Sequence, residues 1–219
     1  MAERKGNKKY VFTVEGECER LYLEHLQKLI NGDSKSIFTV EIKAIVTAEL
    51  SKTAKTFNPV TIPQPLYHLC DVESESDEHV ARFESILRDL RTVKEQKYLK
   101  YELGYSNFTF DLWMILHKNI CNGCSNHRKE YLRFINKEYK MSFSSMDEYK
   151  ERGNFQKCLD QLTLVEIKEA INRAKNIMNI RERQGDKEIP YCGYKYYKSN
   201  PALTIWKCIE KILKDCKLA

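Results

Sequence analysis

The sequence predicts an α/β fold with a mostly parallel sheet flanked by helices, followed by a helical C-terminal part. Three observations predict it. Short runs of β-branched and aromatic residues alternate with longer segments whose apolar residues recur every three to four positions. Two of the short runs end in acidic residues, and the chain beyond residue 126 has a helical pattern. Strands that alternate with helices are typical of a parallel sheet.

The first elements follow from this alternation. Residues 10–14 are apolar and partly β-branched, which predicts a buried strand. Residues 19–30 carry apolar side chains at helical spacing, and Asn31 and Gly32 close the predicted helix. The β-branched residues 37–46 predict a second strand.

The next elements continue the pattern. Three prolines within residues 48–65 predict a connecting loop. Residues 66–72 predict a third strand, and residues 77–97 predict a helix with one apolar face. A fourth strand over residues 98–105 and a short apolar helix over residues 108–118 complete the predicted α/β part.

Two long helices are predicted in the C-terminal part. Residues 163–183 place their apolar side chains on one face, and residues 201–218 form the terminal helix. Pro201 suits the first turn of that helix, with Ser199 or Asn200 as its cap.

The composition is that of a soluble globular protein. The 219 residues suffice for an α/β core over residues 1–120 with a helical part over residues 121–219, packed on it or continuous with it. No apolar run approaches the ~20 residues that cross a bilayer, and the N-terminus has no apolar signal core. We therefore expect a cytoplasmic protein with mostly reduced cysteines. Its formal charge of +6 suits nucleic acid as a partner.

Acidic residues follow two of the predicted strands. Glu15 comes directly after the first strand, and residues 71–78 hold five acids. Parallel strands end at the same edge of a sheet, where ligands of open α/β folds bind. Asp71 and Glu73 are two positions apart, so in an extended strand they share a face. Carboxylates are the ligands that Mg²⁺ and Mn²⁺ prefer, whereas the alternative for residues 71–78 is a solvated loop.

Five segments resemble one known family. They read VFTVEGECERLYLEHL, LYHLCDVESES, SNFTFDLWMILHK, EAINRAK and SNPALTIWKCIEKIL. In this order they are similar to the motifs of RloB-like proteins, a Toprim-type family of bacterial phage-defence loci of the AbiL-like kind. The resemblance covers nearly the whole chain and implies a Toprim-like core.

The resemblance implies a metal-dependent nuclease. It makes Glu15, Asp71 and Glu73 catalytic, and it implies that these three residues and Glu75 hold Mg²⁺ or Mn²⁺. Three positions differ from the family pattern: Glu73 replaces an aspartate, Phe108 a proline and Asp111 a glutamate. The longer Glu73 changes the reach of a ligand for an ion that demands regular geometry. The family's third motif corresponds to Ser106, Asn107, Asp111, Trp113 and His117; further residues expected around the site or against substrate are Glu19, Lys195 and Lys198.

The resemblance also implies partners. The substrate would be a nucleic acid, tRNA or DNA, and the companion would be a separate ABC-type or OLD-like ATPase subunit in abortive-infection defence. A homodimer through an unpaired sheet edge is a further expectation.

Two residues of the third motif have a second interpretation. His117 could be a core or capping histidine, and Trp113 could simply pack in the core.

Two other motifs carry alternatives. Cys121, Cys124 and His127 have the ligand types of zinc, but a fourth ligand would have to come from Cys158 or Cys192, and the usual second pair is absent. Residues 191–198 interleave tyrosines with lysines, which fits either binding of unpaired bases and phosphates or a packed strand.

Two rival functions remain at this point. One is a non-catalytic assembly or sensor subunit with the Toprim shape. The other is a phosphoryl-transfer enzyme that acts on nucleotides. The sequence has no Gly-x-Ser-x-Gly elbow, Walker loop or Gly-x-Gly-x-x-Gly motif, which argues against a serine hydrolase, a P-loop ATPase or a dinucleotide enzyme.

Overall fold

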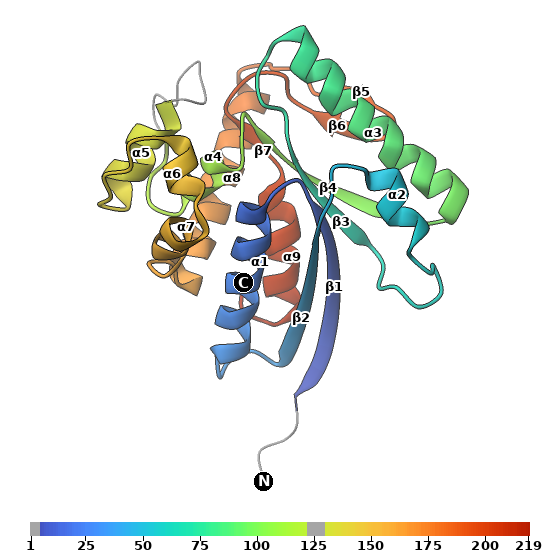
Figure 1. Ribbon diagram of the computed structural model, residues 1–219, viewed down its shortest axis with the longest axis horizontal. Helices are drawn as coiled ribbons and strands as arrows, with labels where there is room; N and C mark the ends of the chain where they lie inside the picture. Colours follow the sequence, from blue (N-terminus) through green and yellow to red (C-terminus); the bar gives the residue numbers. More distant parts are fainter. Residues whose placement is uncertain (1–4, 122–129) are drawn as a thin grey trace.

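The computed structural model describes residues 5–121 and 130–219, which are built around a five-stranded sheet (Figure 1). The strand order is β2-β1-β3-β4-β7; β1 is parallel to β2 and β3, β3 is parallel to β4, and β7 is antiparallel to β4. A separate antiparallel hairpin joins β5 and β6. The strands are β1 (Gly6–Val14), β2 (Phe38–Val46), β3 (Leu66–Asp71), β4 (Tyr101–Asn107), β5 (Ile189–Tyr191), β6 (Tyr194–Tyr196) and β7 (Ala202–Leu203).

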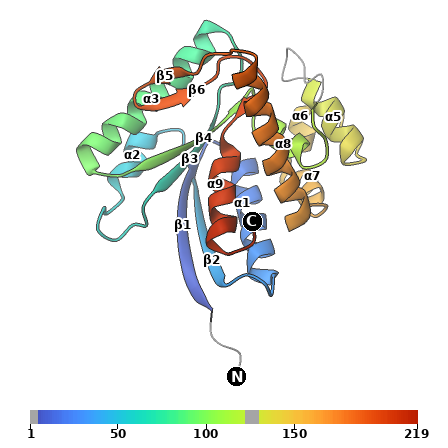
Figure 2. The ribbon, with the colours of Figure 1, turned by 180° about the vertical axis from the view of Figure 1, so that it is seen from behind.

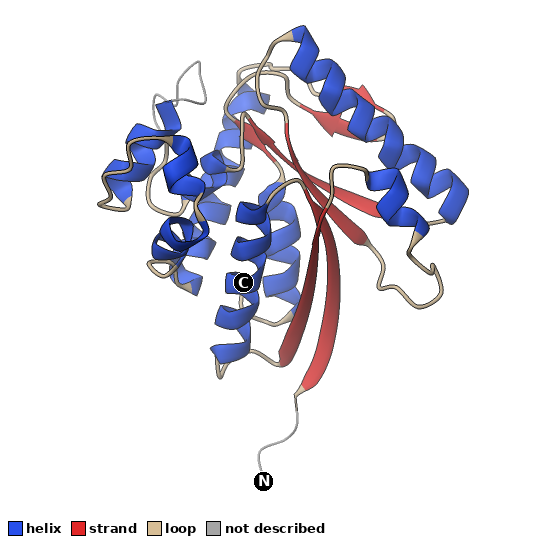
Figure 3. Ribbon diagram, viewed as in Figure 1, coloured by secondary structure: helices blue, strands red, loops and turns tan. Residues whose placement is uncertain are grey.

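Helices cover both faces of the sheet. Helices α1 and α9 lie on one face, and α2 and α3 lie on the other with the β5–β6 hairpin (Figures 1 and 2). Helices α5, α6 and α7 form a group beside α1 and α8, and Figure 3 shows how the strands run between these layers. In the described ranges, no helix has the length and apolar character needed to span a membrane. The helices are α1 (Glu17–Gly32), α2 (Leu50–Lys55), α3 (Asp77–Lys97), α4 (Asp111–Leu116), α5 (Tyr131–Glu138), α6 (Met146–Lys150), α7 (Arg152–Leu159), α8 (Leu164–Arg183) and α9 (Ile205–Asp215).

The alternation of side chains along β1 creates two hydrophobic clusters. Phe12 and Val14 face α1 and α9 and belong to the larger cluster, which continues into α4 to α8. Val11 faces the other way and packs in the smaller cluster with Phe83 and Leu87 of α3. Successive residues of a strand point to opposite faces, so one apolar strand supports both layers. The larger cluster joins residues from both halves of the chain.

Side chains of α1 cover the outer edge of β2. The Val40 N–H donates to Asn31 Oδ1 at 2.7 Å, and Asn31 Nδ2 donates to the Val40 carbonyl at 2.9 Å. The Ile42 N–H donates to Gln27 Oε1 at 2.5 Å. These bonds occupy groups that an added strand would need. A second copy that pairs with β2 at Val40 and Ile42 must first displace Asn31 and Gln27.

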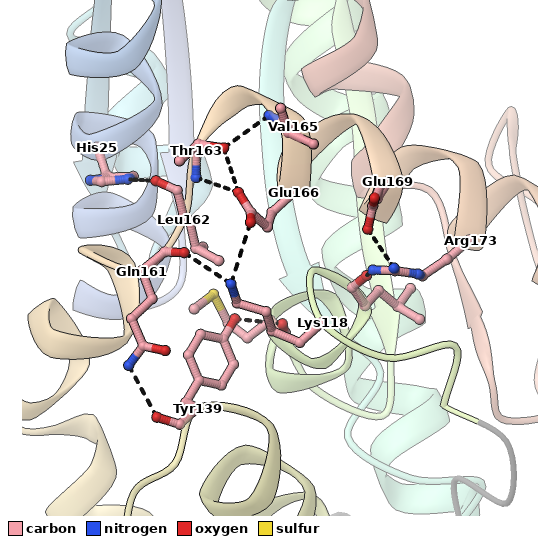
Figure 4. A network of polar contacts seen from close by, with 12 residues as sticks. His25, Lys118, Tyr139, Gln161, Leu162, Thr163, Val165, Glu166, Glu169 and Arg173 are labelled. Atoms are coloured by element: carbon pink, nitrogen blue, oxygen red, sulfur yellow. Dashed lines mark hydrogen bonds and ion pairs between the residues drawn. The ribbon is translucent and has the colours of Figure 1, made fainter.

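A polar network fixes the start of α8 against the end of α4 (Figure 4). Thr163 and Glu166 form a capping box, in which the Val165 N–H donates to Thr163 Oγ1 and the Thr163 N–H donates to Glu166 Oε2. Lys118 Nζ lies 3.6 Å from Glu166 Oε1 and donates to the Gln161 carbonyl at 2.9 Å. The network thus ties the C-terminal part to the segment that follows the fourth strand.

The predicted α/β class is confirmed, with a mostly parallel sheet flanked by helices. The predicted loop over residues 48–65 was wrong in one stretch, because Leu50 and Ala54 are buried and anchor the short helix α2. The fourth strand begins at Tyr101, because Tyr98 ends α3 with a left-handed backbone (φ 55°). The Toprim-like character of the core and the division at residue 120 stay predictions.

The C-terminal part contains the short strands β5, β6 and β7 beside its helices, whereas the sequence indicates a strand there only as one alternative for residues 191–198. The terminal helix begins at Ile205, so Pro201 is not in its first turn and Ser199 and Asn200 do not cap it. Instead, residues 202–203 pair with the end of β4. Thr204 donates its N–H to the Tyr105 carbonyl, so β4 holds this segment extended before the helix begins.

Candidate active site

The ends of β1 and β3 bring two carboxylates together. These strands are parallel neighbours, with Val14 opposite Leu69. Glu15 follows β1 directly and Asp71 is the last residue of β3. The Asp71 N–H donates to Glu15 Oε2 at 3.0 Å. The two acids chosen from the strand ends therefore lie side by side.

Glu19 adds a third carboxylate from the first turn of α1. It is 8% exposed. Its carboxylate folds back over Gly16, where a Cβ would stand 3.0 Å from Glu19 Oε2. Glycine thus leaves room for the carboxylate at the start of the helix, and the helix dipole favours negative charge there.

Asp111 supplies the fourth carboxylate from the start of α4. It is 2% exposed, and Thr109 Oγ1 donates to its Oδ2 at 2.9 Å. Lys150 Nζ, from the end of α6, lies 3.7 Å from the same oxygen. We call Glu15, Glu19, Asp71 and Asp111 the carboxylate cluster.

The members of the carboxylate cluster repel one another. Burial raises the pKa of Asp71 well above its usual range, and the charges of Glu19, Glu15 and Asp111 raise it further. Burial also raises the pKa of Glu15, although the hydrogen bond from Asp71 opposes the shift. Burial, with the charges of Glu15 and Asp111, raises the pKa of Glu19 to about 7. Concentrated negative charge of this kind is typical of a functional site.

One oxygen of the carboxylate cluster is buried without a partner. Asp71 Oδ1 is inaccessible and accepts no hydrogen bond from the described residues. Buried polar atoms are normally satisfied, so this oxygen fits a bound cation or water. Among residues 5–121 and 130–219, no three His, Cys, Asp or Glu side chains stand at the spacing of a ready metal-ligand group.

Glu73 and Glu75 have partners of other kinds. Glu73 lies beyond the end of β3 with a positive φ of 69°, so the expected shared face with Asp71 along an extended strand is not realised. Arg82 Nη1 donates to Glu73 Oε1 at 3.0 Å, and His79 Nε2 lies 3.5 Å from its other oxygen. Glu75 Oε1 accepts from the Asn200 N–H at 3.1 Å. Their role as metal ligands stays a prediction.

A comparison with protein families now identifies the chain. The model of the family described as RloB-like protein matches residues 10–212. The chain belongs to the RloB-like family. Neither the curated proteins nor the solved structures compared with the chain included a match. The matched region of this RloB-like protein contains the whole carboxylate cluster and Lys150.

The segment of the third motif, from Ser106 to His117, holds the backbone around Asp111. Ser106 Oγ donates to the Thr109 carbonyl at 2.8 Å, which closes the turn before Asp111. Asn107 Nδ2 donates to the carbonyls of Tyr197 and Lys198 at 3.4 and 2.5 Å. This motif therefore shapes the backbone that presents Asp111 and joins it to the C-terminal segment.

His117 and Trp113 of the same motif lie in the core. His117 is fully buried, with Nδ1 2.8 Å from the Trp113 carbonyl and Nε2 3.1 Å from the Tyr22 hydroxyl. Burial lowers the pKa of His117 to about 3, so it is neutral at physiological pH. This geometry favours the interpretation of His117 as a core histidine.

The segment of interleaved tyrosines and lysines forms the β5–β6 hairpin. Tyr194 and Lys195 line a cavity of about 880 Å³ with residues of α3, the start of β4 and Lys207. Lys195 Nζ lies 3.5 Å from Glu188, and Lys198 Nζ lies 3.3 Å from Asp77. Contact of Lys195 and Lys198 with nucleic acid stays a prediction.

The zinc alternative falls partly outside the described residues. Cys124 and His127 lie there, whereas Cys121 is buried at the end of the segment that follows α4. Cys158 and Cys192, the alternative fourth ligands, are free thiols.

Sequence reasoning missed Lys150 and Arg82. Both are lysine or arginine residues in charged stretches of chain, where nothing local marks them. Arg82 lies on α3 one turn after His79, whereas Glu73 lies in the loop before this helix. Helical spacing therefore could not predict that Arg82 and Glu73 form an ion pair. The fold brings Lys150 to Asp111 of the carboxylate cluster and Arg82 to Glu73 beside it.

We expect the stability of a Glu19→Gln variant to depend on pH differently from that of the unchanged protein. The pKa of Glu19 in the folded protein is about 7, above the usual 4.5. The contribution of this group to the stability of the fold is therefore fully present below pH 4.5 and is lost as the pH rises through 7. Glutamine does not titrate, so the melting temperature of the variant should gain on that of the unchanged protein between pH 5 and pH 8. The shift corresponds to a free energy on the order of 3 kcal/mol.

The measurement is thermal unfolding followed by circular dichroism at both pH values, in the presence of a chelator. Glu17→Gln is the matched control, because Glu17 is exposed and pairs with Arg20 on the outer face of α1. An equal difference in melting temperature at pH 5 and pH 8 would contradict the proposed repulsion.

Proposed function

We propose that this protein is a Mg²⁺- or Mn²⁺-dependent nuclease that hydrolyses phosphodiester bonds of RNA, such as tRNA, or of DNA. The observation that carries the proposal is the carboxylate cluster, in which acids at the ends of β1 and β3 and at the starts of α1 and α4 gather at one edge of the sheet. Such a concentration of negative charge is costly without a cation. Membership of the RloB-like family supports the same activity.

The residues fit a hard divalent cation. Asp71 offers a buried oxygen with no hydrogen bond from the described residues, and the Glu15 carboxylate accepts the backbone N–H of the same residue. Oxygen ligands are those that Mg²⁺ and Mn²⁺ prefer. In this proposal Asp71 and Glu15 would hold the cation, with Glu73, two residues beyond Asp71, as a further ligand. A bound cation would supply positive charge that stabilises the phosphate and activates water.

Other residues of the chain would act on protons and on the substrate. Glu19, whose pKa lies near 7, can both accept and donate a proton at neutral pH, which suits a general acid or base. Arg82 has a 63% exposed side chain and pairs with Glu73, so a substrate phosphate can compete for its guanidinium. The net charge of +6 favours a long polyanion over a small substrate.

Membership of the RloB-like family also supports a role in anti-phage defence with an ATPase partner. In this proposal the ATPase subunit holds the nuclease inactive and releases it during infection, so the nuclease is the effector of abortive infection. The nuclease activity should therefore be measured with the purified protein alone and with the ATPase subunit added.

The test is a cleavage assay with three substrates and a chelator control. Purified protein, with and without the ATPase subunit, is incubated with total tRNA, plasmid DNA or nucleoside triphosphates in Mn²⁺ or in EDTA. We expect cleavage of one polymer class in Mn²⁺ and none in EDTA. Hydrolysis of nucleotides alone would point to a different phosphoryl-transfer enzyme. Failure to cut any substrate in Mn²⁺, both with and without the ATPase subunit, would favour the alternative that this protein is a non-catalytic subunit.

A further inference from the structure

Lys150 reaches the carboxylate cluster from the C-terminal part of the chain. Its ammonium lies 3.7 Å from Asp111 Oδ2, whose side chain is 3% exposed, whereas the side chain of Lys150 is 45% exposed. The lysine therefore spans from solvent to a buried acid. The negative charge of Asp111, with smaller contributions from Asp71 and Glu19, raises the pKa of Lys150.

The short helix α6 holds Lys150 in this position. Its neighbour Tyr149 is fully buried, with ring centroids 5.8 Å from Phe143 and 5.5 Å from Phe155. Ser145 caps the helix by accepting from the Glu148 N–H. The backbone at Lys150 is thus anchored, while its side chain remains partly exposed to solvent.

We propose that Lys150 is an exchangeable counter-ion of the carboxylate cluster, whose ammonium competes with a divalent cation for the same negative charge. The inference rests on the proposed function for its biological meaning, although cation binding can be measured without it. An ammonium that reaches the cluster from solvent can withdraw without disturbing the core, because the Lys150 side chain is not buried in it. Lys150 would therefore set the concentration of Mg²⁺ or Mn²⁺ at which the cluster fills.

This role has a direction that a purely structural role lacks. Removal of a positive charge strengthens the attraction of the remaining acids for a cation. Loss of a merely structural contact would loosen the cluster and weaken cation binding. The sign of the change in affinity therefore separates the two roles.

The experiment is a calorimetric titration of the full chain with Mn²⁺ at low ionic strength. We expect Lys150→Met to bind Mn²⁺ about three- to tenfold more tightly than the unchanged protein, and Lys150→Glu to bind more tightly still. Lys150→Arg keeps the charge and should stay within about twofold. The difference should shrink at high salt, because the lysine is partly exposed.

Lys157→Met is the matched control, because Lys157 lies on the adjacent helix α7, is exposed and donates to Asn154. It should leave the Mn²⁺ affinity unchanged. Equal or weaker binding by Lys150→Met, or no Mn²⁺ binding by any form, would overturn the inference. A protein that shows the expected order of affinities but cuts no polymer would overturn the proposed nuclease and leave the counter-ion role standing.

Discussion

Substitution of Glu15 by glutamine should abolish most of the proposed nuclease activity, lowering the cleavage rate by about 10² to 10⁴-fold. The Glu15 carboxylate accepts the Asp71 N–H within the carboxylate cluster, so it is placed to hold a cation beside Asp71. Glutamine keeps the size of the side chain and can still accept the Asp71 N–H. The change therefore removes the charge while it preserves the local geometry.

The fold of this variant should be intact and its melting temperature equal or higher in a chelator. One member of a group of mutually repelling acids has been neutralised, and burial already raises the pKa of Glu15. The measurements are single-turnover cleavage of the polymer found in the substrate assay, and thermal unfolding of the same preparation. Loss of activity together with loss of the fold would not support a catalytic role.

Glu17→Gln is the control for this prediction also. Glu17 is two residues further along the chain, exposed, and engaged by Arg20. Its cleavage rate should stay within about twofold of the unchanged protein, because exposed ion pairs contribute little. Equal rates for Glu15→Gln and the unchanged protein would remove the cluster from the reaction and point to a contaminating nuclease.

Substitution of Trp113 by alanine should lower the free energy of unfolding by about 3 to 5 kcal/mol. Trp113 is fully buried and packs edge-on against Tyr22 of α1 and His117, with ring centroids 6.1 and 4.9 Å apart. Alanine would leave a large cavity where α1, α4 and the C-terminal helices meet. Because α4 also carries Asp111, part of the carboxylate cluster would lose its support.

The measurement is urea unfolding followed by circular dichroism, which does not depend on tryptophan fluorescence. The second tryptophan, Trp206, provides a matched control, because it is only partly buried and its indole N–H donates to the Leu203 carbonyl at 3.1 Å. Trp206→Ala should cost clearly less, about 1 to 2 kcal/mol. Similar losses for the two variants would contradict the view that Trp113 is the central aromatic residue of the larger cluster.

Much of the fold follows from local sequence patterns. The helix over residues 77–97 was predicted with the bounds that the structure has, because its apolar residues recur on one face over the whole length, and in the structure Ser76 caps its start. The two-residue strand β7 could not be predicted, since two residues carry no periodicity. Its conformation is set by β4, which precedes it by about a hundred residues.

The site was predictable only where it depends on strand ends. Glu15 and Asp71 follow from the rule that parallel strands end together. Glu19 and Asp111 came from the family resemblance. The partner of Asp111, Lys150, is fixed by the packing of Tyr149 inside a helical group, which no spacing rule describes.

The late position of β7 in the chain has a consequence for synthesis on the ribosome. The end of β4 pairs on its outer side with residues 202–203, and the Asn107 amide donates to the carbonyls of Tyr197 and Lys198. A growing polypeptide leaves the ribosome with its N-terminus first, so the first four strands can associate before residues 197–203 have been synthesised. Chains interrupted before residue 197 would lack them, and the edge that carries the acids would stay unfinished in prematurely terminated products.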